Sequence, residues 1–282
     1  MNNLIVLSHY QLRGIGVSRP QAPTPFPLSL DLNRSTVMAT LAENGLHLPD
    51  GQTLAWEQLD EIRATENGCY LVAESEIRKI QFFSETTGRF VSLFPTTNAP
   101  TMLVAGFPMH RIKNTEPYRD TLSKIKAAAP LSGLVLDTTM GLGYTAIEAA
   151  KTAQHVTTIE LDPAVVEVCH LNPWSQALFA NPKITLRQGD AFTEINALAS
   201  QTFARVVHDP PVFSLAGDLY GLDFYRELVR ILKPRGRVFH YIGDPDSKSG
   251  KNVMRGVIQR LQQAGFQRVE LRPQAFGVVA YK

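Results

Sequence analysis

Residues 135–145 of this chain read VLDTTMGLGYT, and this stretch decides the fold. An apolar run ends in Asp137, passes through Gly141 and Gly143, and opens an alanine-rich segment. This order predicts a strand, a tight turn and a helix start, an arrangement in which backbone N–H groups face a nucleotide-like ligand. The glycine pattern is incomplete and weak alone, so its weight depends on the strands that come after it in the chain.

Three more predicted strands come after this turn, and each ends in an acid. Residues 156–160 end in Glu160, about 20 residues after Asp137, where nucleotide-binding α/β units place an acid for the ribose hydroxyls. Residues 184–190 end in Asp190, and residues 205–213 hold an Asp-Pro-Pro sequence after a strand. The sequence therefore predicts a row of carboxylates at the carboxyl edge of a parallel sheet, where ligands of open α/β sheets bind.

These motifs resemble the class I S-adenosylmethionine-dependent methyltransferases. The resemblance rests on residues 137–143, Glu160, Asp190 and residues 209–211, and it continues through a Lys-Pro-x-Gly turn at residues 233–236 into a fifth strand and a terminal hairpin. The family usually has a further glycine at the position of Thr139. The N-terminal part of the chain lies outside the resemblance.

Three other stretches are similar to a narrower family of predicted methyltransferases best known from archaea, whose acceptor is not established. They are residues 109–113, 171–175 and 214–217, which read MHRIK, LNPWS and SLAG. Together with the strand and helix pattern, the resemblance implies an α/β fold: a Rossmann-like class I methyltransferase sheet with helices on both faces and a terminal β-hairpin, over residues 106–282.

The first part of the chain has a different pattern. Residues 1–105 predict a small β-rich N-terminal domain, because short β-branched and aromatic runs alternate with turn sequences such as Asn-Gly and Pro-Asp-Gly. Strands are expected at residues 28–32, 35–41, 70–73, 80–83 and 90–94, with a short helix or turn at residues 56–62. Residues 21–27 hold three prolines and cannot form a central strand.

Composition narrows the class of protein. The 282 residues suffice for two domains, and 44% hydrophobic with 19% charged residues is ordinary for a soluble globular protein. A net charge of +2 neither argues for nucleic acid nor forbids it. Cys69 and Cys169 form no metal or redox spacing and are expected as buried thiols in a reducing cytoplasm. No apolar stretch is long enough to span a bilayer, so we expect a cytoplasmic protein without membrane contact; the oligomeric state stays open.

The resemblance implies S-adenosyl-L-methionine as the cofactor and no metal. Glu160 suits the ribose hydroxyls, and Asp190 suits the adenine amine, with Ala191 and Phe192 against the ring. Asp137 orders the turn or meets the ammonium group of the cofactor, while turn N–H groups face its carboxylate. The full predicted cofactor set is Asp137, Thr138, Gly141, Gly143, Tyr144, Glu160, Leu161, Asp190, Ala191 and Asp209.

The Asp-Pro-Pro loop is the predicted catalytic element, formed by Asp209, Pro210 and Pro211. Asp209 can accept a hydrogen bond from an acceptor amine, and the prolines stiffen the loop. The competing interpretation is that Asp209 only caps this loop. Phe213 is a candidate to stack on an acceptor base, against a plain core role.

Two further loops at the same edge, residues 214–221 and 241–251, supply Tyr220 and Lys248 as candidate acceptor contacts, although a solvated loop lysine is the simpler interpretation. From residue 115 a helix is expected, with Leu122, Ile125 and Ala129 on its apolar face. His208 and His240 lack a third ligand at metal spacing and are expected as satisfied polar residues.

Three functions compete. The leading hypothesis is an S-adenosylmethionine-dependent methyltransferase with an unknown acceptor, for which an RNA base or another amine is a candidate. The alternative is an aminopropyltransferase like spermidine or spermine synthase, which shares the fold and uses decarboxylated S-adenosylmethionine. That compound lacks the carboxylate that the turn's donors would hold. The third is a non-catalytic protein that keeps the cofactor pocket.

Overall fold

The computed structural model describes residues 4–16, 19–213, 215–244 and 247–282. The chain divides into two compact units, and each is described by itself. The first comprises Met1–Tyr118 and Ala164–Gln176, and the second comprises Arg119–Pro163 and Ala177–Lys282. The boundary predicted after residue 105 falls at the turn between strands β10 (Thr101–Val104) and β11 (Phe107–Pro108).

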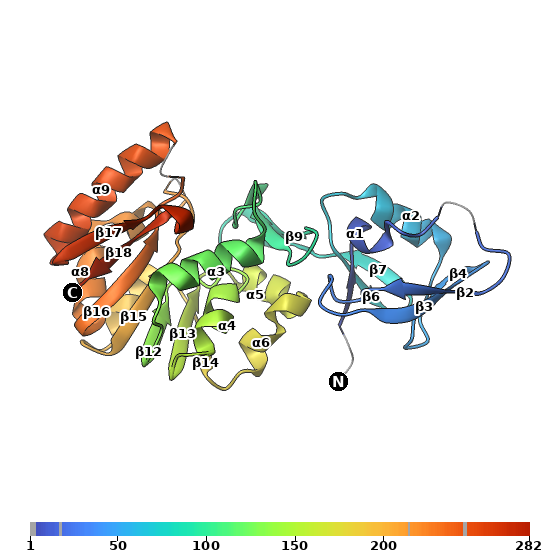
Figure 1. Ribbon diagram of the computed structural model, residues 1–282, viewed down its shortest axis with the longest axis horizontal. Helices are drawn as coiled ribbons and strands as arrows, with labels where there is room; N and C mark the ends of the chain where they lie inside the picture. The colour runs from blue at the N-terminus through green and yellow to red at the C-terminus, as the bar shows by residue number, and fades with distance from the viewer. Residues whose placement is uncertain (1–3, 17–18, 214, 245–246) are drawn as a thin grey trace. The chain divides into compact units, whose positions relative to one another are not determined.

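The first unit is rich in β-structure, as the turn-separated apolar runs predict (Figure 1). Its sheets have the orders β1-β6-β7, β2-β3-β4-β5 and β11-β10-β9-β8. The remaining elements are β1 (Ile5–Leu7), α1 (His9–Leu12), β2 (Thr24–Leu28), β3 (Val37–Ala42), β4 (Gly45–His47), β5 (Thr53–Leu54), α2 (Trp56–Ala64), β6 (Tyr70–Ala73), β7 (Glu76–Lys79), β8 (Gln81–Ser84) and β9 (Arg89–Phe94). Helix α5 (Pro163–His170), apart from its first residue, and the 3-10 turn η1 (Pro173–Ser175) also belong to this unit.

Strand β2 and the turn after it bear on two of the expectations for this unit. The strand predicted at residues 28–32 is displaced, because the strand that forms, β2, ends at Leu28. The following chain turns through Leu32 and Asn33 in the left-handed region, where Asp31 accepts hydrogen bonds from the backbone N–H groups of Arg34 and Ser35. Strand β2 does contain two of the three prolines. It is an edge strand that pairs with β3 alone, so the N–H groups that proline lacks are not needed for pairing with a second strand.

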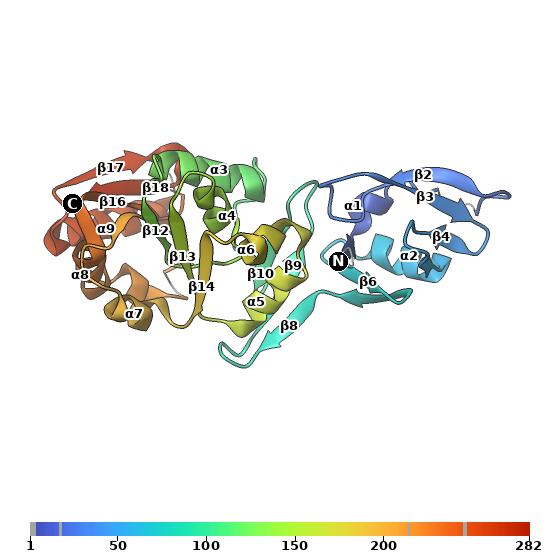
Figure 2. The same cartoon turned by 90° about the horizontal axis from the view of Figure 1, so that it is seen from below.

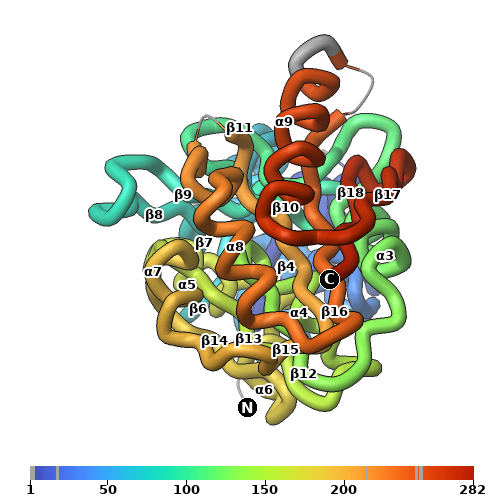
Figure 3. The backbone as a smooth tube through the Cα atoms, turned by 90° about the vertical axis from the view of Figure 1, so that its left-hand side faces the viewer, coloured from blue at the N-terminus to red at the C-terminus, as the bar shows by residue number. Residues whose placement is uncertain are grey.

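The second unit is built on a seven-stranded sheet of order β14-β13-β12-β15-β16-β18-β17. The first five strands in that order are parallel, and β18 lies antiparallel between β16 and β17. Helices α3 and α4 cover one face, while α7, α8 and α9 cover the other (Figures 2 and 3). This is the predicted Rossmann-like methyltransferase-type sheet with its terminal hairpin, and the fold prediction is confirmed.

The bounds of its strands are β12 (Leu134–Asp137), β13 (His155–Glu160), β14 (Ile184–Gln188), β15 (Phe203–His208), β16 (Leu232–Tyr241), β17 (Arg268–Arg272) and β18 (Gly277–Tyr281). The helices are α3 (Pro117–Ala128), α4 (Tyr144–Ala150), α6 (Gln176–Ala180), α7 (Ala191–Glu194), α8 (Leu222–Ile231) and α9 (Lys248–Ala264), with short turns η2 (Ile195–Ala197), η3 (Gly217–Tyr220) and η4 (Pro273–Ala275). The strands β12, β15 and β16 contribute buried aliphatic residues to one core with α8 and α9.

The predicted turn at residues 233–236 is absorbed into strand β16. Pairing with β15 jumps from Leu232, opposite Phe203, to Arg237, opposite Arg205, so residues 233–236 form a bulge. Arg235 has a φ of 62°, which turns the chain there. No helix in the described parts of the chain combines the length and the apolar composition needed to cross a membrane.

Candidate active site

Four acids stand at neighbouring strand ends, as the sequence predicts. The strand order places Asp190 after β14, Glu160 at the end of β13, Asp137 at the end of β12, and Asp209 after β15. Strands β12 and β15 are adjacent, although the chain passes through β13 and β14 between them, so the order reverses here. We call these four residues the carboxylate row. It lies where open α/β sheets bind their ligands.

Asp137 is the most deeply buried member of the row. Its Oδ2 accepts a hydrogen bond from the Thr158 hydroxyl at 2.8 Å, whereas its Oδ1 is buried and has no hydrogen-bond partner. Burial raises the pKa of Asp137 to about 8, and the charges of Asp209 and Glu160 add to this rise, although the Thr158 hydroxyl and the Thr139 backbone N–H oppose it. A buried acceptor without a partner costs free energy, so this oxygen is suited to a ligand that brings a donor, above all a cationic one.

Glu160 ties the glycine turn to the neighbouring strand. Its Oε2 accepts from the Gly141 N–H at 3.1 Å, and its Oε1 accepts from the Asp162 N–H at 2.9 Å. Burial raises the pKa of Glu160 to about 7, although these N–H groups oppose the shift. Each carboxylate oxygen can accept a second hydrogen bond, so the predicted contact with ribose hydroxyls is compatible with this geometry.

The glycine turn leaves room for a ligand on one side and none on the other. Gly141 and Gly143 have φ values of 53° and 74°, in the left-handed region that favours glycine. A Cβ on Gly141 would meet no atom within 4 Å, while one on Gly143 would lie 2.8 Å from Leu178 Cδ2. The turn therefore packs through Gly143 and presents an open surface at Gly141, which fits a nucleoside cofactor.

Two of the other predicted cofactor residues, Thr138 and Asp190, have structural partners of their own. Thr138 is buried, and its hydroxyl oxygen lies 2.7 Å from His208 Nδ1. Tyr144 is also buried. Asp190 caps helix α7, because its Oδ1 accepts from the Phe192 N–H. Leu161 is 46% exposed and Ala191 is buried. Their contacts with a cofactor stay predictions.

The Asp-Pro-Pro loop is held from several sides. Thr139, which stands at the glycine position of the resembled family, donates its hydroxyl to the Asp209 carbonyl at 2.8 Å. Tyr220 is buried and donates its hydroxyl to the Pro211 carbonyl at 3.0 Å. Tyr220 therefore braces the loop, and its predicted contact with the acceptor stays a prediction, as do the catalytic roles of Pro210 and Pro211.

The side chain of Asp209 has a partner that sequence reasoning missed. Lys124 Nζ lies 2.6 Å from Asp209 Oδ2 and 3.0 Å from Asp120 Oδ2, and it sits 4.4 Å from the centre of the Tyr241 ring. Burial lowers the pKa of Lys124, but the charges of Asp209 and Asp120 outweigh it and raise that pKa above its ordinary value. Lys124 is therefore an ammonium ion.

Helix α3 is where the sequence prediction failed. Its expected apolar face contained Leu122, Ile125 and Ala129, but Leu122 is 41% exposed. The buried face contains Asp120, Thr121, Lys124 and Ala128. An Asp and a Lys four residues apart on a helix usually form a solvent-facing pair. Here the polar face is turned inward because Lys124 pairs with Asp209, which follows β15.

Phe213 is 52% exposed, so it is not the core residue of the competing interpretation, and its ring packs edge-on to Tyr220 with centroids 5.4 Å apart. Residues 248–251 were expected in a loop but begin helix α9, because the Ser247 hydroxyl caps it by accepting from the Gly250 N–H. The side chain of Lys248 lies outside the described parts of the structure, as does Ser214.

Both histidines are held by neighbouring protein groups. His208 Nε2 donates to the Leu219 carbonyl at 2.9 Å, so Nδ1 accepts from Thr138, and burial lowers the pKa of His208 to about 3. The Tyr225 hydroxyl lies 2.8 Å from His240 Nε2, and burial likewise lowers the pKa of His240. Over the residues that the structure describes, no group of three or more potential ligands could hold a metal ion.

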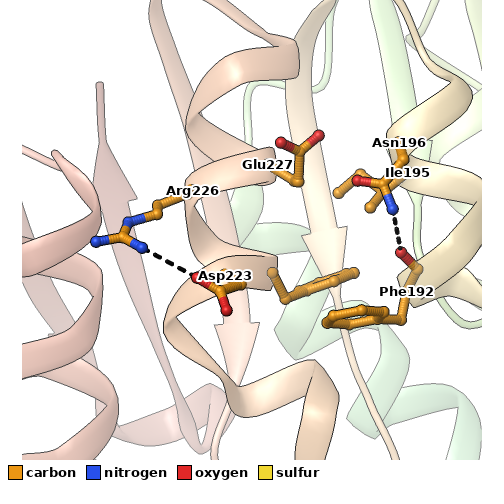
Figure 4. Close-up of a pocket in the computed structure, with 7 residues that line it drawn as sticks. Phe192, Ile195, Asn196, Asp223, Arg226 and Glu227 are labelled. Carbon is orange, nitrogen blue, oxygen red and sulfur yellow. Dashed lines mark hydrogen bonds and ion pairs between the residues drawn. The ribbon is translucent and has the colours of Figure 1, made fainter.

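A surface cavity lies beside helices α7 and α8, and α7 is the helix that Asp190 caps (Figure 4). It has a volume of about 190 Å³ and contains Phe192, whose ring stacks on that of Phe224 with centroids 6.3 Å apart. Phe192 therefore has a packing partner within this cavity, and its predicted contact with adenine is not needed to explain its position. The polar groups of the cavity are themselves paired, as in the contact between Arg226 and Asp223.

The second unit is similar to a known family of domains. A family model described as the spermine/spermidine synthase domain matches residues 134–272, the range that holds the whole carboxylate row. A crystal structure of spermidine synthase in complex with the transition-state analogue AdoDATO has a TM-score of 0.59, with 15% identity over 71% of each chain, which shows the fold. Residues 134–272 of the second unit are thus similar to the spermine/spermidine synthase domain, on a Rossmann-like fold of the methyltransferase type.

The chain belongs to the same family as the uncharacterized protein MJ1233 of Methanocaldococcus jannaschii. The two are 40% identical over 90% of this chain and 88% of that protein. A polyamine aminopropyltransferase of Streptomyces coelicolor is 30% identical over 45% of this chain, but the aligned part is only 25% of that protein.

These comparisons correct the leading functional hypothesis. Methyl transfer was predicted from a turn and a row of acids, but the matching family is that of spermine and spermidine synthases, and the stated alternative is the better supported one. The error has a physical cause. The two kinds of enzyme use adenosyl sulfonium compounds that differ by one carboxylate, so acids that meet the shared adenosine and ammonium groups do not tell which group is transferred.

Proposed function

We propose that this protein is an aminopropyltransferase, which moves the aminopropyl group of decarboxylated S-adenosylmethionine to an amine acceptor of the polyamine class. The observation that carries the proposal is Asp137: a buried carboxylate with one unpartnered oxygen, inside the residues that match the spermine/spermidine synthase domain. The aminopropyl ammonium of this cofactor supplies the cationic donor that Oδ1 lacks.

The glycine turn supports the same choice of cofactor. The Gly141 N–H donates to Glu160, and the Gly143 N–H donates to the Met140 carbonyl at 2.8 Å. These two donors are already used within the protein, so they are not available to an anionic end of the ligand. Decarboxylated S-adenosylmethionine has no carboxylate and makes no such demand.

The reaction is an in-line displacement. The lone pair of the acceptor nitrogen attacks the aminopropyl carbon next to the sulfonium, the N–C bond forms as the C–S bond breaks, and the electron pair of that bond stays on sulfur. The products are methylthioadenosine, which is neutral, and a secondary ammonium, which then loses a proton. Alignment of the two reactants is the main contribution that a protein makes to such a step, and it is worth about 7–11 kcal/mol.

The roles of the carboxylate row follow from its order. We assign Asp190 to the adenine, Glu160 to the ribose, Asp137 to the aminopropyl ammonium, and Asp209 to the acceptor nitrogen. Asp209 follows β15, the strand next to that of Asp137, and its side chain is 19% exposed, so an acceptor can approach it. Asp209 accepts a hydrogen bond from the amine, which turns the lone pair toward the carbon.

The test is a direct assay. Purified protein is incubated with decarboxylated S-adenosylmethionine and a panel of di- and polyamines, and release of methylthioadenosine is measured beside the mass of the amine product. We expect an amine heavier by one aminopropyl group. The surface carboxylate Asp223 offers a matched control, since Asp223→Asn removes a charge whose partner, Arg226, is itself more than half exposed.

Two results would overturn the proposal. One is transfer from S-adenosylmethionine with no release of methylthioadenosine from the decarboxylated compound. The other is binding of the cofactor without turnover on any amine, which would indicate the non-catalytic alternative.

A further inference from the structure

The structure assigns Lys124, on helix α3, as the positioning residue for Asp209. The inference rests on the proposed function, because that function gives Asp209 its task. Lys124 does not reach the reacting atoms in this proposal. It acts on them through the carboxylate that it holds.

The first argument is the cost of burying Lys124. Its side chain is 2% exposed, and a buried ammonium is tolerated only when carboxylates compensate it. Asp120, one helical turn earlier on the same helix, is fully buried and pairs with Lys124. Lys124 nevertheless makes its shorter contact, 2.6 Å against 3.0 Å, with Asp209 on a different element.

The second argument is the placement of the charge. Lys124 reaches Oδ2 of Asp209, while Thr139 holds the Asp209 backbone carbonyl, so both ends of the residue are fixed from separate elements. The ring of Tyr241 beneath the ammonium adds a cation–π contact that keeps Lys124 at this point. A carboxylate that is fixed in this way offers its acceptors to an incoming amine in one orientation.

The third argument concerns the charge state of Asp209. The titratable groups gathered around the Lys124–Asp209 pair come from four elements: Asp120 and Lys124 from α3, Asp137 from β12, Tyr220 from η3 and Tyr241 from β16. Two of them, Asp120 and Asp137, are carboxyl groups, which favour protonation of Asp209 wherever they are ionised. The ammonium of Lys124 opposes this and keeps Asp209 ionised when the acceptor arrives.

The test measures Asp209 itself. Protein labelled with ¹³C at aspartate carboxyls is titrated by NMR, and Asp209→Asn assigns the signal. In Lys124→Met, which keeps the length of the side chain without its charge, we expect the pKa of Asp209 to rise by at least one pH unit. The acid limb of the pH profile of kcat/KM for the amine, measured at saturating decarboxylated S-adenosylmethionine so that Asp137 does not limit it, should move by the same amount, while KM for decarboxylated S-adenosylmethionine changes less than twofold.

A second variant keeps the inference falsifiable where Lys124→Met does not fold. Lys124→Gln retains a donor for Asp209 but removes the charge, and a smaller rise in the same direction is expected. Lys151→Met is the control, because Lys151 pairs with Glu148 on helix α4 and its side chain is 60% exposed. It should leave the Asp209 titration unchanged.

The outcomes separate the two proposals. If Asp209 titrates at the wild-type pH in a folded Lys124 variant, the positioning role is overturned whatever the activity. If the wild-type protein transfers no aminopropyl group, the proposed function fails, and the titration still decides whether Lys124 controls the state of Asp209.

Discussion

The two sides of the carboxylate row solve the problem of buried charge in opposite ways. On one side Asp137 and Glu160 stand close together and, among the residues that the structure describes, form no ion pair with a protein cation; burial raises the pKa of each. On the other side Asp209 is paired with the buried ammonium of Lys124. Under the proposed function a ligand neutralises the first side, whereas the protein itself supplies the cation for the second.

This difference indicates which part of the reaction each side serves. A buried carboxylate that has no protein cation as a partner can be compensated by the positive charge of a ligand. A group that orients a nucleophile must have a fixed charge and direction before the nucleophile enters. Four measurements test this division, from the largest expected effect to the smallest.

Asp209→Asn removes the group assigned to the acceptor amine. We expect kcat to fall by about 10²–10⁴-fold, the usual range for a lost acid–base group, because the amine is no longer oriented or deprotonated. The dissociation constant for decarboxylated S-adenosylmethionine should change less than about threefold. Stopped assays and calorimetry measure the two quantities. An equal loss in both would place Asp209 on the cofactor side.

Asp137→Asn removes the counter-ion assigned to the aminopropyl group. A hydrogen bond to a charged group contributes about 1.5–3 kcal/mol, so affinity for decarboxylated S-adenosylmethionine should fall roughly 10–150-fold. Methylthioadenosine has no ammonium and should bind the variant almost as well as the wild type. Comparable weakening of both ligands would contradict the assignment of Asp137.

The pH dependence of binding depends on the same residue. Asp137 must be ionised to meet the ammonium, and its pKa in the free protein is raised to about 8, so binding requires loss of a proton below that pH. Affinity for decarboxylated S-adenosylmethionine should decline as pH falls from 8, by up to about tenfold per unit. Methylthioadenosine should decline only near pH 7, where Glu160 titrates. Parallel curves for the two ligands, measured by calorimetry, would rule out Asp137 as the cation site.

The stability of the folded protein should change with pH in the opposite direction to the affinity for the cofactor. An acid whose folded pKa is raised holds its proton in the folded protein while the unfolded chain has lost it, so stability falls between about pH 4 and pH 8. The Tm of Asp137→Asn minus that of the wild type should therefore increase over this interval and level off above it. Thermal melts at several pH values provide the measurement, and a flat difference would show that burial of Asp137 carries no such cost.

The sequence predicted one side of this comparison better than the other. Asp137, Glu160 and Asp190 were found because each ends an apolar β-branched run, and that pattern is local. Lys124 was missed because its helix was expected to bury Leu122 and Ile125, and an Asp–Lys pair on a helix usually faces water. Its partner Asp209 is 85 residues away along the chain, and no local pattern indicates such a contact.

The first unit shows the same limit. Strand β6 was predicted with the bounds that the structure has, because its apolar alternation is regular. Strands β4 and β5 were not predicted, because short strands with few apolar residues form only when neighbouring strands pair with them.

By itself, then, the sequence determined the parallel sheet, its terminal hairpin and the line of acids at strand ends, since hydrophobic periodicity and turn residues act over short stretches of chain. Tertiary structure alone decided which acid has a cation and which does not. That outcome depends on the order of strands and on which face of α3 is turned inward, and both are set by packing between distant segments. The reacting group was fixed by neither, because two cofactors that differ by one carboxylate fit the same strand ends.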